Sequence, residues 1–137
     1  ELFLSNFESG QADLLSLQFP DNSVKNLSCM HTVEHVGLGR YGDKIDPDGD
    51  LKAIAELKRV LAVGGNLLFV VPVGEPHIEF NAHRIYSYEQ IISYFKDFTL
   101  KEFLLIPEKS GSPIIGASAE MVSKEKYACG CFWFIKK

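Results

Sequence analysis

The sequence predicts an α/β fold in which parallel strands form the centre of the sheet and the last strand runs antiparallel. The order of segments is strand, helix, strand, helix, strand, strand, which is typical of α/β domains. Residues 66–73 form a short, continuous apolar run after two glycines, as strands buried on both faces do. No helical segment separates the last two predicted strands, so we expect them to pair antiparallel.

The chain of 137 residues has the length of one domain, and we treat residues 1–137 as a single domain. Its net charge of −4, without a cluster of Lys and Arg, gives no electrostatic reason to expect a nucleic-acid partner. The longest apolar run, residues 66–74, is too short to span a membrane. Because no signal peptide is visible either, we expect a cytoplasmic protein without a membrane partner.

Three cysteines, an odd number, argue against a disulfide framework. Cys129 and Cys131 are two positions apart and would share one face of a strand. No C-x-x-C pair or second cluster accompanies them. We therefore expect buried small side chains in a reducing compartment, and no metal site.

The first part of the chain contains an irregular apolar segment, a turn and a strand. Residues 11–19 are consistent with a strand that runs into a loop. Residues 19–23, FPDNS, are rich in turn-forming residues. Residues 24–33, VKNLSCMHTV, predict a strand of about eight to ten residues.

A helix is predicted from Asp50, because apolar residues recur after it at helical spacing. Asp48 or Asp50 would cap its first turn, and Gly64–Gly65 would end it. Ser87 and Gln90 predict a capping box at the start of a second helix. The remaining predicted strands lie at 66–73, 98–107 and 127–137.

Gly37, Gly39 and Gly42 match the dinucleotide-binding pattern G-x-G-x-x-G. In that motif the glycines turn a strand directly into a helix, whose N-terminus faces a pyrophosphate. Here the next residues, DKIDPDGD, contain a proline and four acids, and they cannot form that helix. We therefore interpret the three glycines as turns.

His31, Glu34 and His35 spell H-x-x-E-H, a zinc-peptidase pattern. The pattern requires both histidines on one helical face, but SCMHTV is β-prone and no third ligand is identifiable. The DPDGD stretch resembles a calcium-binding loop, yet Leu51 stands where that loop requires glycine. We interpret DPDGD as a turn followed by a helix cap.

Residues 12–73 resemble the second half of a class I S-adenosylmethionine-dependent methyltransferase. ADLLSLQFPDNSV resembles the turn after that family's third strand, CMHTVEHV its fourth strand, and AIAELKRVLAVGGNLLFVVPV its next helix and fifth strand. VEHVGLGRYGD, DPDGD and IEFNAHRIY resemble the motifs of an uncharacterised methyltransferase-like family. The resemblance implies a Rossmann-like fold and S-adenosylmethionine as the cofactor.

The resemblance also implies that the cofactor lies beyond the carboxyl ends of the strands. Asp13, at the end of the third strand, would accept a hydrogen bond from the adenine amino group, and the Leu14 backbone would face the ring. The backbone from Cys29 through Met30 to His31 would line the methionine end. An ordinary turn acid is the alternative for Asp13.

The polar loop after the fifth strand is the predicted substrate-binding region, because loops on a rigid scaffold often carry function. Arg84 is suited to holding a carboxylate or phosphate, and His83 to accepting a proton. A plain solvated loop is the alternative. The predicted substrate-binding residues are Arg40, Tyr41, His77, Glu79, Asn81, His83 and Arg84.

His31 and His83 are the candidate catalytic bases, because imidazole titrates near neutral pH. A histidine that organises its loop by hydrogen bonding is the alternative for His31. Glu34 and His35 have a similar alternative, in which they cap and orient the next turn. The glycine loop at 37–42 would form a flexible lid over the substrate.

The sequence contains neither the glycine-rich first-strand turn of class I methyltransferases nor the acid that holds the ribose hydroxyls. We therefore expect the C-terminal portion of the fold, with the N-terminal strands missing. The sheet edge and apolar faces exposed in this way predict a homodimer through that edge.

Three functions follow from these observations. The first is a methyltransferase that acts on an unknown small molecule or sugar. The second is a cofactor-free remnant or interaction module that keeps the fold without the chemistry. The third is a metal-dependent hydrolase.

Overall fold

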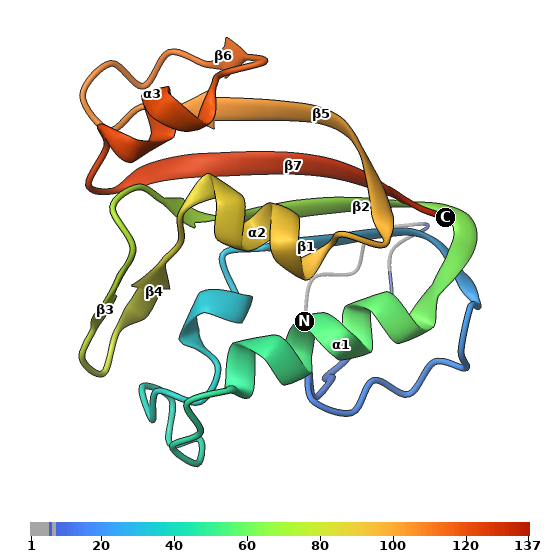
Figure 1. Ribbon diagram of the computed structural model, residues 1–137. Coiled ribbons are helices and arrows are strands. Elements are labelled where there is room, and N and C mark those ends of the chain that lie inside the picture. The colour runs from blue at the N-terminus through green and yellow to red at the C-terminus, as the bar shows by residue number, and fades with distance from the viewer. Residues whose placement is uncertain (1–5, 7) are drawn as a thin grey trace.

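One five-stranded mixed sheet organises the protein in the computed structural model, which describes residues 6 and 8–137 (Figure 1). Strands β1 and β2 are parallel, whereas β7 is antiparallel to both of its neighbours, β2 and β5. The expected α/β sheet with a pair of parallel strands and an antiparallel last strand is therefore confirmed, although the parallel pair lies at one edge of the described sheet. In spatial order the strands are β1 (Val24–Met30), β2 (Leu61–Val73), β7 (Ala128–Lys136), β5 (Phe98–Ile106) and β6 (Ile114–Ile115).

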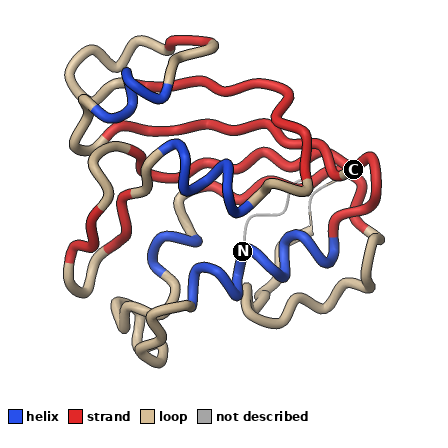
Figure 2. The backbone as a smooth tube through the Cα atoms, viewed as in Figure 1, coloured by secondary structure: helices blue, strands red, loops and turns tan. Residues whose placement is uncertain are grey.

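Helices α1 (Gly49–Val60) and α2 (Tyr88–Tyr94) cover the same face of the sheet (Figure 2). Their apolar sides bury a core in which aromatic rings dominate. Phe95 on the α2 side stacks against Phe134 of β7, with ring centroids 4.5 Å apart, and Phe69 of β2 lies edge-on to Phe95 at 5.1 Å. These contacts attach the end of α2 to the sheet through buried apolar surface.

The boundaries of the helices differ in part from the sequence-based expectation. Ser87 and Gln90 form the predicted capping box of α2. Helix α1, however, ends at Val60, and β2 begins in the next residue. The prediction that Gly64–Gly65 ends the helix is wrong: Gly64 has a φ of +75°, and it lies where the pairing of β2 with β1 shifts register.

Three short elements complete the fold and border the functional region. A single 3-10 turn, Val33–His35, follows β1, and a hairpin of β3 (His77–Glu79) and β4 (His83–Ile85) follows β2. Helix α3 (Ala119–Ser123) precedes β7. None of the helices in the described part of the chain is long and apolar enough to cross a membrane.

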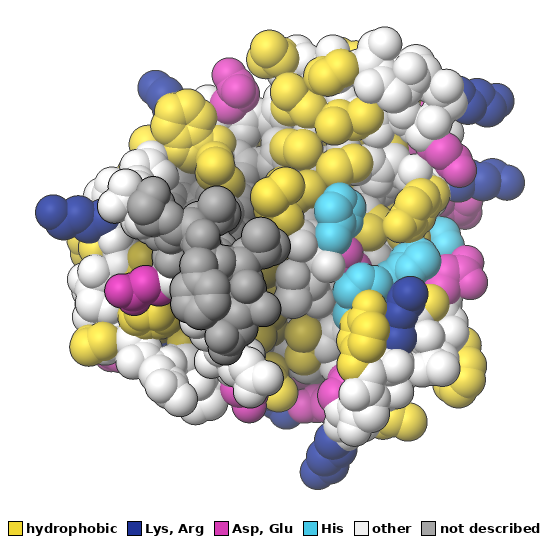
Figure 3. All heavy atoms as spheres, turned by 180° about the vertical axis from the view of Figure 1, so that it is seen from behind, with side chains coloured by type: hydrophobic (Ala, Val, Ile, Leu, Met, Phe, Trp, Pro, Cys, Tyr) yellow, Lys and Arg dark blue, Asp and Glu magenta, His cyan; other side chains and the backbone are white. Residues whose placement is uncertain are grey.

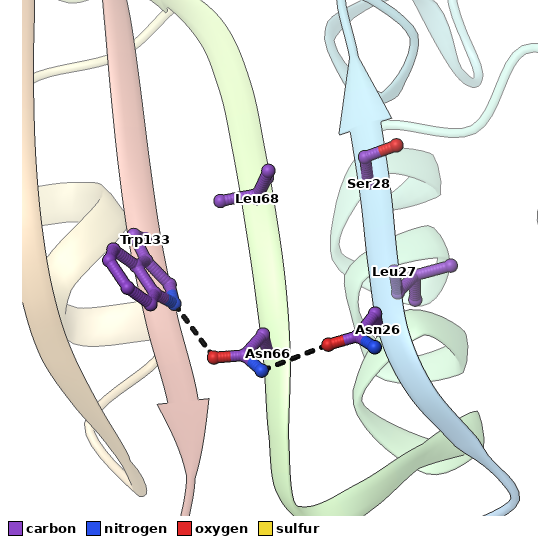
Figure 4. Close-up of a pocket in the computed structure, with 6 residues that line it drawn as sticks. All are labelled: Asn26, Leu27, Ser28, Asn66, Leu68 and Trp133. Carbon is purple, nitrogen blue, oxygen red and sulfur yellow. Dashed lines mark hydrogen bonds between the residues drawn. The ribbon is translucent and has the colours of Figure 1, made fainter.

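The face of the sheet opposite α1 and α2 carries exposed apolar side chains (Figure 3). Met30 of β1 is 63% exposed and Leu68 of β2 is 50% exposed. Between the strands, Asn66 donates to Asn26 and accepts from the Trp133 indole, both at 2.9 Å (Figure 4). A shallow hollow of about 520 Å³ lies over these residues, and β1 forms the edge of the described sheet.

Candidate functional site

A cavity of about 470 Å³ lies at the carboxyl end of β1, where the chain leaves the sheet. His31 makes this exit possible, because it adopts a left-handed φ of +48° while its N–H donates to Val70 of the neighbouring strand at 2.9 Å. A non-glycine residue held at positive φ is uncommon and often marks a functional position. The cavity lining brings together the predicted residues Asp13, Leu14, His31 and Tyr41.

Two of the predicted cofactor-contacting residues lie apart from this cavity. Cys29 is buried inside β1, and Met30 projects from the exposed face of the sheet. Neither residue lines the cavity. Of the three residues predicted to hold the methionine end, the structure places only His31 in its wall.

Asp13 lies at the cavity rim but not at the end of a strand. The described residues before β1 contain only an isolated bridge between Asp13 and Ser16, so the predicted strand over residues 11–19 is wrong. Asp13 forms a tight turn in which its Oδ1 accepts from the Leu15 N–H at 2.9 Å. Among the described residues no partner is found for the second carboxylate oxygen of Asp13, which can accept a further hydrogen bond.

Glu56 and Arg59 of helix α1, which were not predicted to have a role, attach the segment that carries Asp13 to this helix. Arg59 donates to the carbonyls of Leu17 and Phe19, each at 2.9 Å, and pairs with Asp21 at 2.7 Å. Glu56 accepts from the Leu17 N–H at 2.9 Å, and the Arg59 guanidinium beside it lowers the pKa of Glu56 to about 2. In sequence the only signal was an ordinary Glu–Arg pair on the polar face of a helix.

The glycine loop forms a second wall of the cavity, and it is tightly hydrogen-bonded. The N–H of Gly37 donates to the Asp43 carboxylate at 2.7 Å, and its carbonyl accepts from the Asp46 N–H at 2.9 Å. Asp43 also accepts from the Tyr41 N–H, and Asp46 pairs with Lys52. The loop is therefore built as a fixed wall, which differs from the flexible lid that we expected.

We expected Arg84 to hold a carboxylate or phosphate of the substrate, but internal partners occupy its guanidinium. Its side chain is 5% exposed, and its guanidinium donates to the carbonyls of Val36 at 2.6 Å and Pro47 at 3.2 Å. Asp50 lies 3.5 Å from it and also accepts from the Tyr86 hydroxyl at 2.9 Å. Through these contacts Arg84 connects the glycine loop to the hairpin. Its guanidinium is therefore unavailable to a carboxylate or phosphate.

The hairpin brings some of the other predicted substrate residues to a separate, open cavity of about 700 Å³. His77, Glu79 and His83 line this cavity, whereas Asn81 at the hairpin tip and Arg40 do not. Arg40 instead lies 5.5 Å from the centre of the Tyr41 ring and reaches the Ala82 carbonyl at 3.4 Å. Burial lowers the pKa of His83, which keeps its imidazole neutral at physiological pH.

A third cavity, of about 490 Å³, also has His31 in its lining. In the back view histidine side chains gather on one part of the surface (Figure 3). The Nδ1 atom of His31 is 3.2 Å from Oε1 of Glu34, a carboxylate that is only 1% exposed. The Nε2 atom of His31 is 3.6 Å from the Cys129 sulfur. The imidazole thus connects a buried carboxylate to a thiol that lines the third cavity.

The three cysteines are not all buried, which corrects the sequence-based expectation. Cys29 is buried, and burial raises the pKa of its thiol to about 11. Cys129 and Cys131 share one face of β7 as expected, but they are half-buried, with sulfurs 3.8 Å apart. Over the described ranges, no group of three or more His, Cys, Asp or Glu side chains is arranged to hold a metal ion.

Solved structures of other proteins share this architecture. The YcgJ protein from Bacillus subtilis aligns over 93% of this chain and 70% of its own, at 16% identity and a TM-score of 0.58. The [4+2]-cyclase SpnF aligns over 93% of this chain and 56% of its own, at 16% identity and a TM-score of 0.59. A SAM-dependent methyltransferase from Thermotoga maritima aligns over 90% of this chain and 61% of its own, at 18% identity and a TM-score of 0.53.

The chain thus spans between 56% and 70% of the length of these three proteins. At such low identities the similarity shows the fold alone, and it confirms the Rossmann-like fold of class I methyltransferases. No curated protein matches the chain. Residues 18–113, more than half of the sequence, match the family described as "Caenorhabditis protein of unknown function, DUF268", and the chain belongs to this family.

Proposed function

We propose that this chain is part of a cytoplasmic S-adenosylmethionine-dependent methyltransferase that acts on a small molecule or sugar. The observation that carries the proposal is the cavity beyond β1, which collects Asp13, Leu14 and His31 from two separate segments. Its volume of about 470 Å³ falls within the range of ligand-binding cavities. Its position, beyond the carboxyl end of a parallel strand, is where open α/β sheets bind ligands.

The residues present fit the two ends of the cofactor. The second carboxylate oxygen of Asp13, for which the described residues offer no partner, is an acceptor suited to the adenine amino group, and Leu14 supplies apolar surface for the ring. His31 and Thr32 line the same cavity and would contact the methionine end of the cofactor. When bound, the cofactor supplies a methyl group on a positively charged sulfur, which leaves as a neutral thioether once an acceptor lone pair has taken the methyl group.

A binding experiment tests this proposal without knowledge of the acceptor. We expect S-adenosylhomocysteine to bind in the micromolar range by calorimetric titration, and Asp13→Asn to weaken binding about tenfold. Asparagine keeps the oxygen that accepts from Leu15, so the turn remains, but it replaces the second oxygen with a donor that cannot pair with an amino group.

Glu8→Gln is the matched control, because it removes an exposed carboxylate of the same segment that does not line the cavity. Its affinity for S-adenosylhomocysteine should equal that of the unmodified protein. Absence of binding by a folded sample would contradict the proposal and favour the alternative, a cofactor-free interaction module. Among the described residues nothing favours a metal-dependent hydrolase.

The open sheet edge favours self-association, and we propose a homodimer formed through β1. The outward side of β1 has no partner strand among the described residues, and Met30 and Leu68 expose apolar surface beside it. Sedimentation at micromolar concentration should detect a dimer, and Met30→Lys should convert it to a monomer. Phe80→Lys is the control, because Phe80 is 91% exposed on the β3–β4 hairpin, which is not part of the sheet that contains β1. The proposed dimer would be contradicted if the parent protein were a monomer. It would also be contradicted if Phe80→Lys dissociated the dimer and Met30→Lys did not.

A further inference from the structure

His31 and His35 belong to the linings of two cavities. Both residues line the cavity proposed for the cofactor, and both also line the third cavity. A methyl acceptor must reach the methyl group from the side away from the leaving sulfur. A second cavity that shares a wall with the cofactor cavity is therefore a place from which an acceptor could approach the methyl group.

Resting on the proposed methyltransferase function, we infer that the acceptor occupies this third cavity, that it is a neutral or cationic polyol or amine, and that His31 takes its proton. The acceptor site is then not the hairpin cavity at His77 and Glu79. Besides His31 and His35, the lining of the third cavity includes Glu34, Glu108, Tyr127 and Cys129.

Glu34 orients the His31 imidazole toward this cavity. Its Oε1 atom lies 3.2 Å from Nδ1 of His31 and 3.7 Å from Nε2 of His35. An ionised carboxylate only accepts hydrogen bonds, so the contact places the His31 proton on Nδ1. Nε2 then carries a lone pair, and it points toward Cys129 in the wall of the third cavity. This is the arrangement of a general base held by a carboxylate.

The second oxygen of Glu34 gives independent support. Oε2 is buried and has no hydrogen-bond partner among the described residues, which is costly for a carboxylate. A positive charge on His31 offsets that cost, because it lies against the same carboxyl group. The acceptor loses one proton as it gains the methyl group, Nε2 of His31 receives this proton, and Glu34 stabilises the imidazolium. Glu34 is thus a positioning residue for the reaction.

The charges around the third cavity define the class of acceptor. Its described lining includes two carboxylates, Glu34 and Glu108, and no Lys or Arg. A phosphate or carboxylate would meet like charge there without a compensating cation. The nearby guanidinium of Arg84 is fully engaged by carbonyls and Asp50. Neutral hydroxyl-rich molecules and amines remain, with Tyr127 and Pro107 supplying apolar surface beside the polar groups.

Three sugars that differ chiefly in charge test the acceptor class. We expect glucose and glucosamine at millimolar concentration to shift the backbone amide signals of Gly111 and residues 127–129 in nuclear magnetic resonance spectra. Glucose 6-phosphate should not shift them. Shifts at His77 and Glu79 instead, binding of the phosphate, or no shift with any sugar would each overturn the inference. These spectra need no cofactor, so they are independent of S-adenosylhomocysteine binding.

Two variants test the proton acceptor. Asparagine tolerates positive φ, so His31→Asn should fold. Because His31 also lines the cofactor cavity, methyl transfer by this variant is measured with the cofactor at saturation. Its methyl transfer to glucose or glucosamine should fall by about 10²–10⁴-fold. Unchanged transfer would remove His31 from the mechanism. Failure of S-adenosylhomocysteine to bind even the parent protein would instead refute the proposed function.

The role of Glu34 has a spectroscopic readout that a purely structural role would not move. In the parent protein, ¹⁵N spectra of the imidazoles should show the His31 proton on Nδ1. The ionisable groups that face this ring are Glu34, His35 and, from β7, Cys129. Glu34→Ala should abolish the preference for Nδ1, and Glu34→Gln, whose amide oxygen still accepts a hydrogen bond, should preserve it. Glu79→Gln is the matched control, because Glu79 forms the same 3.2 Å contact with exposed His77. An effect of the control on His31, or no effect of Glu34→Ala, would contradict this role.

Discussion

Replacing Arg84 with methionine is expected to lower the free energy of unfolding by about 3–5 kcal/mol. The substitution leaves the carboxylate of Asp50 buried without its cationic partner, and it removes the donor that the Val36 and Pro47 carbonyls share. Breaking a buried ion pair from one side is costly because the remaining charge stays out of water. Urea unfolding followed by circular dichroism measures the loss.

Two further variants separate the causes of this effect. Arg40→Met removes an exposed guanidinium with a single 3.4 Å contact, and it should change stability by less than about 0.5 kcal/mol. Adding Asp50→Asn to Arg84→Met should recover part of the loss, because the amide is neutral and still accepts from the Tyr86 hydroxyl. If Arg84→Met were as stable as the parent protein, Arg84 would not hold the loop, and its assignment to a substrate would have to be reconsidered.

Substituting alanine for Gly37 is expected to destabilise the protein by about 3 kcal/mol and to abolish S-adenosylhomocysteine binding. Gly37 has a φ of +80°, and an added Cβ would lie 2.1 Å from the Asp46 carbonyl oxygen, so the loop would have to move. Because this loop forms a wall of the proposed cofactor cavity, the movement should change the cavity as well as stability. Calorimetric titration and urea unfolding measure the two effects.

Gly42→Ala is the matched control for this prediction. Gly42 has nearly the same φ, +81°, but an added Cβ would meet no atom within 4 Å. The control should therefore lose only the cost of a left-handed alanine, about 1–2 kcal/mol, and should still bind S-adenosylhomocysteine. Equal behaviour of the two variants would mean that the contact of Gly37 with Asp46 has no importance for the site.

Much of the fold could be predicted from local patterns. The apolar run at 66–73, the capping box at Ser87 and the strand before His31 all appear in the structure, because each depends on residues close in sequence. The predicted end of α1 was wrong for the opposite reason. A glycine pair is compatible with a helix cap or with a strand irregularity, and the pairing of β2 with β1 selected the second.

The candidate site was predicted less completely, since its geometry depends on residues far apart in sequence. The H-x-x-E-H spelling drew attention to His31 and Glu34, but the contact of His31 with Cys129 joins residues 98 positions apart. Arg84 had the chemistry of an anion-binding residue, and only burial among the Val36 and Pro47 carbonyls gave it a structural role. The anchoring role of Arg59 likewise required knowledge of where residues 17–21 lie.

Local sequence patterns were sufficient to predict the α/β class, the parallel pair of strands and the resemblance to class I methyltransferases. Hydrophobic periodicity, capping residues and turn residues act over a few positions, and they can be read without a structure. Which polar side chains face a cavity, and which are hydrogen-bonded or ion-paired inside the protein, depends on the tertiary structure. A buried carboxylate or guanidinium takes its role from the groups that surround it, and folding alone brings those groups together.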